Sequence, residues 1–431
     1  MFLKKIIENI ADAGRELLEK NFSYKKKDII ELCDDLISFK GAASGIAIAR
    51  EITEIYNSFD SNKKLDFFKQ LNKKFSPSLI KVEKRIENYL KKKDQKSLNE
   101  LGEVIEGNRQ EFIRRLNMAP NGTQFLVSMR EDLLKFTSKN PDLITLDEDI
   151  RHLFKSWFNP GFLRLEKITW DSKAAILEKI IKYEKVHAIK DMNDLKRRLQ
   201  QEDRRFFAYF HPILVDEPLI FVEVAFTKGI GNSIQEIIKP KTEEKIDYDT
   251  ATFYSISNCQ EGLMRVTLGN FLIKRVVFEI QEENPKIKNF GTLSPLPGFA
   301  DWFLSLEKEK VQNILKNYDI SKLDFLRSVD LKIGDPRILE EKTAIKKLVA
   351  HYLINEKINN KPLNQVSRFH LGNGASIHNI LINGNITDYG YKESFGIMIN
   401  YGYQLDKLEK IHEDFFTKGI ISYSDKIKKY V

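Results

Sequence analysis

The stretch that decides the fold is TATFYSISNCQEGLMRVTLGNFLIKRVVFEI, residues 250–280. Its first ten residues are rich in aromatic and β-branched side chains, a composition typical of a buried strand. After a glycine-containing turn, apolar residues recur at spacings of three and four from about residue 268, which predicts an amphipathic helix. The positions expected to face the core are Phe271, Leu272, Val276 and Ile280. A strand leading into a helix predicts a domain that mixes both kinds of element.

The turn inside this stretch is a candidate anion site. The first N–H groups of a helix have no partner within the helix, and together with the helix dipole they favour a negative charge. Gly262 and Gly269 would let a phosphate approach the backbone. The pattern matches neither the P-loop nor the G-x-G-x-x-G fingerprint. Taken alone, it therefore favours a packed connection between strand and helix over a phosphate cradle.

Further strands and helices lie on both sides of this stretch. Two runs before it have strand composition, and later segments alternate between helical and strand-like patterns. The predicted strands are residues 204–214, 218–226, 367–373 and 376–382, and the predicted helices are residues 300–316, 344–357 and 404–416. Residues 161–431 are therefore predicted to form an α+β or α/β domain around a mixed sheet.

Residues 1–160 have a helical pattern throughout. Pro, Gly and Asn interrupt it at residues 76–78, 119–122 and 140–142, where helices are expected to end. No strict repeat of fixed length occurs, so the pattern predicts a helical bundle and not an obvious solenoid. The region contains no cluster of His, Cys or paired carboxylates. We therefore favour a scaffold or oligomerisation role for it over chemistry.

The length and composition of the chain limit the classes of protein to which it can belong. A chain of 431 residues, 42% of them hydrophobic, predicts two domains with substantial cores. No run approaches the roughly 20 apolar residues of a membrane span, and the first twenty residues fit neither a signal peptide nor an acid-poor transit peptide. Cys33 and Cys259 cannot make a disulfide framework or a zinc cluster. We therefore expect a reducing, cytoplasmic location.

The charge of the chain is positive, with 70 Lys and Arg against 62 Asp and Glu, a net charge of +8. This balance is compatible with nucleic-acid binding but equally with a polyanionic small ligand. The lysines are interspersed with glutamates, as in KVEKRIENYLKKKDQKSLNE, and form no basic stripe with interleaved aromatic residues. A solvated, lysine-rich surface is therefore favoured over a nucleic-acid interface.

Two residues are candidates for chemistry by position. His370, in SRFHLGNGAS, is predicted to end a strand before an Asn-Gly turn, where catalytic groups often lie, although position alone favours an ordinary half-buried histidine. Ser294, in FGTLSPLPGFADWF, lies in a loop stiffened by Pro295 and Pro297, but it lacks G-x-S-x-G and alone is best explained as a turn residue. No histidines have the spacing of a zinc protease, so no metal is expected.

Four motifs taken together change this interpretation. The segments TATFYSISNCQEGL…LGNFLIKRVVFEI, TLSPLPGFADWF, RFHLGNGA and IMINYGY occur in the order and at the spacing of the malonyl-CoA decarboxylase family, which the chain resembles. Supporting pieces are GFLRLEKITWDS, VHAIKDMNDLKRRL and DEPLIFVEVAFT. The likeness is dense from about residue 150 to 403 and thin in the first hundred residues. It implies a helical domain at residues 1–160 and a catalytic domain similar to the acetyltransferase (GNAT-like) fold at residues 161–431.

The resemblance also implies an activity and its residues. The implied reaction, part of fatty acid metabolism, converts malonyl-CoA to acetyl-CoA and carbon dioxide without metal or organic cofactor. Ser294, His370 and Tyr403 stand at the family's catalytic serine, histidine and tyrosine. We expect His370 to polarise the thioester oxygen, Ser294 to donate a proton or orient the carboxylate, and Tyr403 to support them. The implied residues for coenzyme A are Gly262, Leu263, Arg265, Val266, Leu268, Gly269 and Asn270.

The chain departs from the family pattern in the turn. Thr267 stands where the family has a glutamate that contacts the serine, and a threonine hydroxyl can hydrogen-bond but cannot act as a base near neutral pH. Arg265 replaces a small residue. A CoA-dependent acyltransferase on the same fold, or a weakened CoA-binding scaffold protein, are therefore alternatives. The resemblance also implies a homo-oligomer, dimer or tetramer, and no nucleic-acid or membrane partner is expected.

Overall fold

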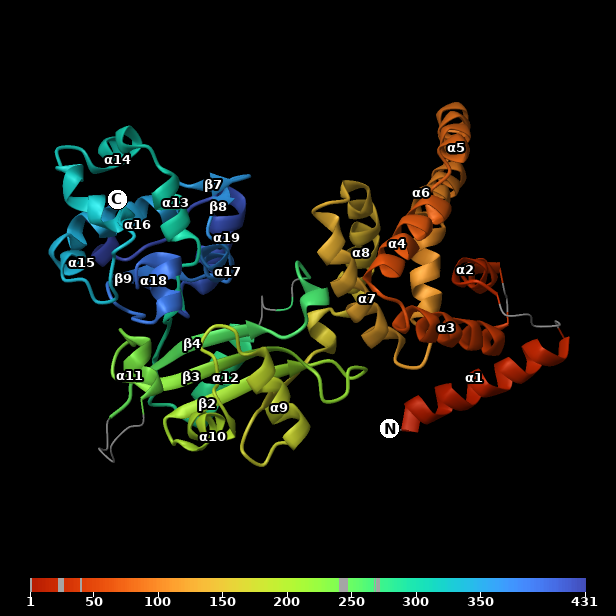
Figure 1. Cartoon of the computed structure of the whole chain (residues 1–431), viewed down its shortest axis with the longest axis horizontal. Coiled ribbons are helices and arrows are strands. Elements are labelled where there is room, and N and C mark those ends of the chain that lie inside the picture. Colours follow the sequence, from red (N-terminus) through yellow and green to blue (C-terminus); the bar gives the residue numbers. More distant parts are fainter. Residues whose placement is uncertain (1, 22–26, 39–40, 240–246, 267, 269–271) are drawn as a thin grey trace. The chain divides into compact units, whose positions relative to one another are not determined.

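The chain folds into two compact units (Figure 1). The computed structural model describes residues 2–21, 27–38, 41–239, 247–266, 268 and 272–431. The first unit, called the helical unit below, contains Met1–Leu163 together with His211–Val215 and Gln260–Thr267. The second, called the sheet unit, contains the rest of the chain from Arg164 to Val431. Part of the turn that follows the decisive strand therefore belongs to the helical unit.

The helical unit is built from amphipathic helices. Its elements are α1 (Phe2–Asn21), α2 (Ile29–Ser38), α3 (Ala42–Asn57), α4 (Ser61–Phe75), α5 (Leu79–Lys92), α6 (Gln95–Leu116), α7 (Gly122–Thr137), η1 (Pro141–Leu143), α8 (Ile144–Trp157), η2 (Pro160–Phe162) and η3 (Glu261–Leu263). The interruptions predicted at residues 76–78, 119–122 and 140–142 all fall at the ends of α-helices, so these predictions are confirmed. The core is aromatic: the ring of Tyr56 meets Phe67 edge-on at 5.4 Å between centroids.

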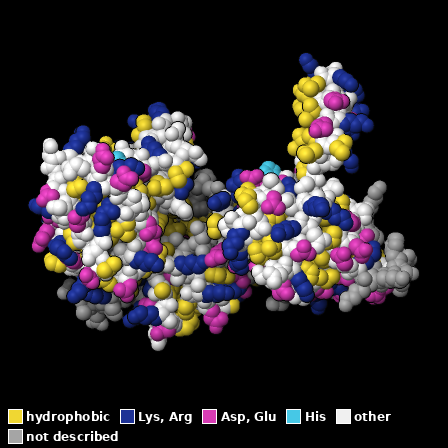
Figure 2. Space-filling view, turned by 45° about the horizontal axis from the view of Figure 1, so that its top comes forward, with side chains coloured by type: hydrophobic (Ala, Val, Ile, Leu, Met, Phe, Trp, Pro, Cys, Tyr) yellow, Lys and Arg dark blue, Asp and Glu magenta, His cyan; other side chains and the backbone are white. Residues whose placement is uncertain are grey.

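Helices α5 and α6 form a hairpin that projects from the rest of the helical unit (Figure 1). Hydrophobic side chains gather along one side of this hairpin, and Lys and Arg along the other (Figure 2). The exposed hydrophobic side chains are Leu79, Ile80, Ile86, Leu90, Leu98 and Ile105. No residue of α5 is buried, although the helix is amphipathic. An uncovered apolar stripe of this kind is typical of a protein–protein contact surface.

A mixed β-sheet forms the centre of the sheet unit. Its strands are β1 (Arg164–Lys167), β2 (Arg204–Phe210), β3 (Pro218–Thr227), β4 (Thr250–Asn258), β5 (Asn289–Thr292), β6 (Ser294–Pro295), β9 (Ser376–Leu381) and β10 (Met398–Tyr403), and β7 (Lys357–Ile358) and β8 (Lys361–Pro362) form a separate hairpin. The order is β1-β2-β3-β4-β5-β10-β6, with β9 also pairing with β10. Strands β4 and β5 are parallel, and the other pairs are antiparallel.

Helices cover both faces of this sheet. The helices of the sheet unit are α9 (Ala174–Tyr183), α10 (Met192–Gln200), α11 (Ile234–Ile238), α12 (Leu272–Glu283), α13 (Phe299–Ser305), α14 (Lys308–Leu315), η5 (Ile320–Arg327), α15 (Arg337–Glu340), α16 (Lys342–Ile354), α17 (Gln365–Gly372), α18 (Asp388–Ser394), α19 (Leu408–Lys418) and α20 (Asp425–Lys428). Phe206 of β2 packs in one cluster with residues of α9 and α10. The neighbouring side chains point to the opposite face, where Arg275 of α12 lies over the ring of Tyr209 and Glu283 pairs with Arg205.

The main elements agree with the sequence predictions. Strands β2, β3, β4 and β9 and helices α12 and α16 are confirmed. In α12, Leu272, Val276 and Ile280 are buried as expected, whereas Phe271 lies outside the described residues. The predicted order, a helical N-terminal region followed by a mixed sheet with helices, is also confirmed.

Three predicted boundaries or types are corrected. Residues 367–373 are not a strand but most of helix α17, because Asn364 caps the helix by accepting the N–H of Ser367. The helix predicted at residues 300–316 is two helices, α13 and α14, which are separated at Leu306. The last predicted helix begins four residues later than expected, at Leu408. Among the described residues, no helix combines the length and the apolar character needed to cross a bilayer.

Candidate active site

Ser294 is held between a strand and a helix. It begins β6, where it lies opposite Ile399 of β10. Four residues later Gly298 adopts a φ of 77°, which glycine does without strain, and α13 starts at the next residue. The loop that contains the two prolines is therefore anchored in the sheet at one end and in a helix at the other.

Asn364 joins this loop to the helix that carries His370. Its side-chain oxygen accepts the N–H of Ser367 at 2.9 Å and so caps α17, while its Nδ2 donates to the carbonyl of Pro297 at 2.8 Å. The side chain is buried, with 2% exposed. One residue therefore fixes the serine loop and the histidine helix together. The sequence analysis missed Asn364, although an Asn before a helix is a recognisable N-cap signal.

Ser294, His370 and Tyr403 lie in one line of hydrogen bonds. Ser294 Oγ is 3.0 Å from His370 Nε2, and His370 Nδ1 is 2.9 Å from Tyr403 Oη. Ser294 Oγ also donates to Thr292 Oγ1 at 2.8 Å. The sequence analysis missed Thr292, whose spacing of two residues from Ser294 on an extended segment is the signal that could have identified it.

One neutral tautomer of His370 matches these contacts. Ser294 has one hydroxyl hydrogen, and it is donated to Thr292. The contact between Ser294 Oγ and His370 Nε2 therefore needs a hydrogen on Nε2. Nδ1 of the neutral ring is then an acceptor, which matches the hydroxyl of Tyr403 as its donor. The resting site thus presents a neutral imidazole with its N–H directed at the serine.

Burial keeps the imidazole of His370 neutral. The residue is 3% exposed, and desolvation lowers its pKa from the ordinary 6.5 to about 3. The ring of Tyr401 stacks on it at 4.6 Å between centroids, and burial raises the pKa of Tyr403 well above 10, so that its phenol remains a donor. No shift of His370 is caused by a neighbouring carboxylate. The group can therefore act as a hydrogen-bond donor without becoming charged.

A cavity of about 250 Å³ opens beside Ser294 and His370. Strand β4 contributes Tyr254, Ser255 and Ile256 to its lining, and α17 contributes Phe369 among others. None of the described residues that line it is Lys or Arg. The cavity is therefore mostly apolar, with a few polar groups that converge near the serine, as is typical of a small-molecule site.

One edge of strand β4 faces this cavity without a neighbouring strand. The parallel register between β4 and β5 ends at the pair Phe253 and Thr292. Beyond it, the chain of β5 continues into β6, which keeps only the pairing with β10 that β5 also has. The pairing of β4 with β3 also shifts at Tyr254, which is an extra residue, or bulge, on β4. The second half of β4 can therefore offer backbone hydrogen bonds to an extended ligand.

A network of buried polar side chains contacts this half of β4. Tyr254 donates to Glu223 at 2.7 Å, and Ser255 donates to Glu184 at 2.7 Å. Arg198 lies 3.3 Å from Glu223. Burial raises the pKa of Glu223 to about 8, while Arg198 lowers it in part. The network fixes the side chains at the bulge but presents no charge to the cavity.

The residues implied for coenzyme A lie in and after the turn that follows β4. Leu263, Val266 and Leu268 are buried, whereas Thr267, Gly269 and Asn270 lie outside the described residues. Gly262 is buried, and a Cβ on it would lie 1.9 Å from the carbonyl oxygen of Val127 on α7. Its need for glycine is thus explained by contact with a helix. Arg265 is exposed and has a φ of 64°, a conformation that suits the small residue of the family pattern.

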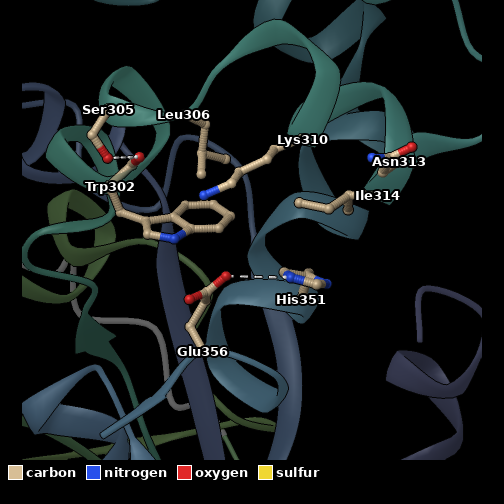
Figure 3. A pocket seen from close by; sticks show the side chains of 8 residues that line it. All are labelled: Trp302, Ser305, Leu306, Lys310, Asn313, Ile314, His351 and Glu356. Atoms are coloured by element: carbon tan, nitrogen blue, oxygen red, sulfur yellow. Dashed lines mark hydrogen bonds and ion pairs between the residues drawn. The ribbon is translucent and has the colours of Figure 1, made fainter.

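A second cavity lies on another side of the sheet unit, between α13, α14 and α16 (Figure 3). It measures about 440 Å³ and is bounded by Trp302 and Lys310, with His351 Nε2 3.4 Å from a Glu356 oxygen. Its serine, Ser305, donates to the carbonyl of Trp302 and lies beside no base. It therefore lacks the paired hydroxyl and imidazole of the cavity at Ser294. Within the described part of the chain, no group of three or more His, Cys, Asp or Glu could hold a metal ion.

Comparison with family models gives two adjacent matches. Residues 161–431 match the model described as malonyl-CoA decarboxylase C-terminal domain. Residues 75–158 match the model of the N-terminal domain of the same family. The two matches together cover most of the chain, and the first alone covers more than half.

Known proteins with the same description are similar along most of their length. Malonyl-CoA decarboxylase, mitochondrial, of Anser anser anser is 33% identical over 74% of this chain and 68% of its own. The protein of that name from Mus musculus is 35% identical over 69% of this chain and 65% of its own. The crystal structure of malonyl-CoA decarboxylase from Rhodopseudomonas palustris has 42% identity and a TM-score of 0.87, covering 93% of this chain and 98% of that one.

We predict that His370 does not titrate between pH 8 and pH 5. Burial disfavours the imidazolium, so its pKa lies near 3. The measurement is NMR of histidine labelled in the ring, with the His370→Asn variant used to assign the signal. A midpoint above pH 5 for that signal would contradict the neutral imidazole.

The same shift predicts how stability depends on pH. Because the folded pKa of His370 is below the ordinary 6.5, unfolding takes up a proton in acid. The stability contributed by the neutral ring is fully present above pH 6.5 and is lost as the pH falls towards 3. Urea unfolding at pH 7 and pH 5 should show a smaller acid loss for His370→Asn than for the parent chain. An equal loss in both would argue against this linkage.

Proposed function

The chain belongs to the malonyl-CoA decarboxylase family, and from this premise we propose that it converts malonyl-CoA to acetyl-CoA and carbon dioxide. The observation that carries the proposal is the buried line of hydrogen bonds from Tyr403 through His370 to Ser294, which ends at a cavity. At the end of this line, the hydroxyl of Ser294 and the N–H of His370 lie beside a mostly apolar cavity. Such a pair suits a reaction that develops negative charge on a carbonyl oxygen and then needs a proton.

The proposed steps use both donors. The bond between the α-carbon and the carboxylate breaks, carbon dioxide leaves, and the electron pair moves onto the α-carbon and the thioester oxygen. In this proposal the Nε2–H of His370, which is directed at Ser294 in the resting site, turns to that oxygen and stabilises it, an interaction typically worth about 10²–10³ in rate. The hydroxyl of Ser294 then protonates the α-carbon to give acetyl-CoA, and a proton from solvent restores the serine.

The described lining of the cavity supports a decarboxylation. The described lining of the cavity contains no Lys or Arg that would pair with the carboxylate of the substrate. A carboxylate that enters such a space loses water without gaining a salt bridge, so its conversion to neutral carbon dioxide is favoured. A site built to retain a carboxylate would instead offer an arginine fork.

We propose that the pantetheine arm of the substrate lies along the open edge of β4. The support is that β4 has no neighbour beyond the pair Phe253 and Thr292, and that its residues line the cavity at Ser294. The arm contains two amides, which can pair with backbone N–H and C=O groups as an added strand does. For the nucleotide end, the family resemblance implies residues of Gly262–Asn270.

We also propose that the reaction needs no metal or organic cofactor. The proposed chemistry requires only a neutral imidazole donor and a hydroxyl, both of which His370 and Ser294 supply. Dialysis against a chelator should leave carbon dioxide release unchanged, and loss of activity that zinc or magnesium restores would contradict the proposal.

We further propose that the protein is a homo-oligomer that associates through the α5–α6 hairpin. The hairpin carries a continuous apolar side, with Leu79 75% and Ile80 80% exposed. Burying apolar surface of this kind stabilises an interface by roughly 25 cal/mol per Å². A second copy can cover the stripe symmetrically, as in most soluble homo-oligomers.

We predict that Ser294→Ala and His370→Ala each lower kcat for malonyl-CoA by about 10²-fold or more, because each removes a donor used in the transition state. The measurement is release of labelled carbon dioxide by the purified protein. Ser305→Ala is a matched control, since that hydroxyl donates to the carbonyl of Trp302 outside the cavity. Full activity in either site variant would refute the assignment, and no release by the parent chain would refute the proposed function.

We predict that replacing Leu79, Ile80 and Leu90 together by Ser yields a smaller particle in light scattering after size-exclusion chromatography. The apolar stripe loses its driving force for association, whereas α5 contributes no buried residue that the fold would lose. Replacing Lys81 and Lys84 by Ser provides a control with residues of the same helix that are also exposed but charged. A monomeric parent chain, or an unchanged mass for the triple variant, would exclude this interface.

A further inference from the structure

Arg130 connects helix α7 to the turn after β4 within the helical unit. Its side chain is fully buried, with 0% exposed. Its Nη1 donates to the carbonyl of Gly262 at 2.6 Å and to that of Met264 at 2.9 Å. Its Nε donates to Asp147 of α8 at 2.7 Å. The guanidinium thus links two helices to two carbonyls of one short turn.

Helix α7 also contacts the turn at a second residue, Gly262. Gly262 approaches Val127 so closely that a Cβ would lie 1.9 Å from its carbonyl oxygen. Val127 and Arg130 are three residues apart and therefore lie on the same side of α7. Steric contact and hydrogen bonding consequently act on the same few residues of the turn.

The backbone that Arg130 holds has a conformation that needs support. Arg265 follows Met264 directly and has a φ of 64°, which residues other than glycine adopt rarely. Such a residue persists where its surroundings fix it. The hydrogen bond from Arg130 to the Met264 carbonyl restrains the peptide just before this residue. The conformation of the turn therefore depends on a side chain from a distant part of the sequence.

We propose that Arg130 is a positioning residue for the substrate, which holds the turn Gly262–Arg265 in the conformation that binds the nucleotide end of coenzyme A. The inference rests on the proposed function, since it takes the turn as the place where that end binds. It gives the helical unit a part in substrate binding, where the sequence favoured only a scaffold or oligomerisation role. Arg130 acts through the turn and not on the reacting atoms.

The decisive variant replaces the buried pair by apolar side chains of similar size, Arg130→Met with Asp147→Leu. Such a replacement is often neutral for stability, whereas removal of one partner leaves a buried charge unpaired. It removes both hydrogen bonds to the turn. The matched control is Arg109→Met with Asp149→Leu. That pair joins α6 to α8 at 2.6 Å, and the other described partners of Arg109 are Asn72, Ser76 and Thr145, none of which belongs to the turn after β4.

The experiment measures the contribution of the nucleotide end of the substrate separately from that of the reacting thioester end. Calorimetry with coenzyme A alone gives Kd, and kinetics are compared for malonyl-CoA and malonyl-N-acetylcysteamine, which lacks the nucleotide. The Arg130/Asp147 variant should raise Kd and the KM for malonyl-CoA about tenfold or more, with kcat nearly unchanged. Its kcat/KM for the short thioester should equal that of the parent chain, and the Arg109/Asp149 control should match the parent chain throughout.

Two further variants keep the test decisive if the double variant does not fold. Arg130→Lys retains the charge beside Asp147 but not the planar fork, so it should raise Kd in the same direction. Gly262→Ala leaves the ion pair intact and displaces the turn from Val127, with the same expected result. An unchanged Kd in the variants that fold overturns the inference, and so does an equal loss with both thioesters.

The outcomes distinguish this inference from the proposed function. If the parent chain releases no carbon dioxide but binds coenzyme A, the proposed function fails while the comparison of Kd still decides the role of Arg130. If the parent chain releases carbon dioxide and Kd is the same in every variant, the inference fails alone. A parent chain that does not bind coenzyme A overturns the inference as well.

Discussion

The divergence of strands β4 and β5 after Phe253 and Thr292 is the constraint on which the rest of the site depends. Because the chain leaves β4 there and stays paired with β10 through β6, the second half of β4 keeps an open edge. Ser294 and residues of β4 both line the resulting cavity, and β10, the partner of β6, also carries Tyr403. The loss of one strand partner thus creates space for a ligand beside the hydroxyl of Ser294.

The partner of His370 decides which chemistry the site supports. In a Ser-His-Asp triad, a carboxylate stabilises the imidazolium that forms when the histidine removes the serine proton. Here Nδ1 faces the phenol of Tyr403, whose pKa is raised by burial, and the pKa of His370 itself is lowered to about 3. An imidazolium is therefore disfavoured. The arrangement suits a neutral donor to an enolate oxygen and not a base that turns Ser294 into a nucleophile.

Local patterns predicted the elements better than they predicted the site. The strands at β2, β3 and β4 and the helix α12 follow from composition and periodicity, which are properties of short segments. The prediction of a strand at α17 was wrong because Asn364 caps the segment as a helix. The same side chain also donates to the carbonyl of Pro297. The contact between Ser294 and His370 joins residues 76 positions apart, so motif resemblance, not local pattern, was needed to expect it.

The turn after β4 illustrates how far a glycine pattern can be interpreted without a structure. A glycine signals a close approach, but the pattern does not say what approaches. At Gly262 it is the carbonyl of Val127, whereas the left-handed residue of the turn is Arg265, where that conformation costs roughly 1–2 kcal/mol. The family pattern has a small residue at this position, whereas this chain has an arginine. The cost of this conformation is offset by contacts from α7, so the turn cannot be understood apart from the helical unit.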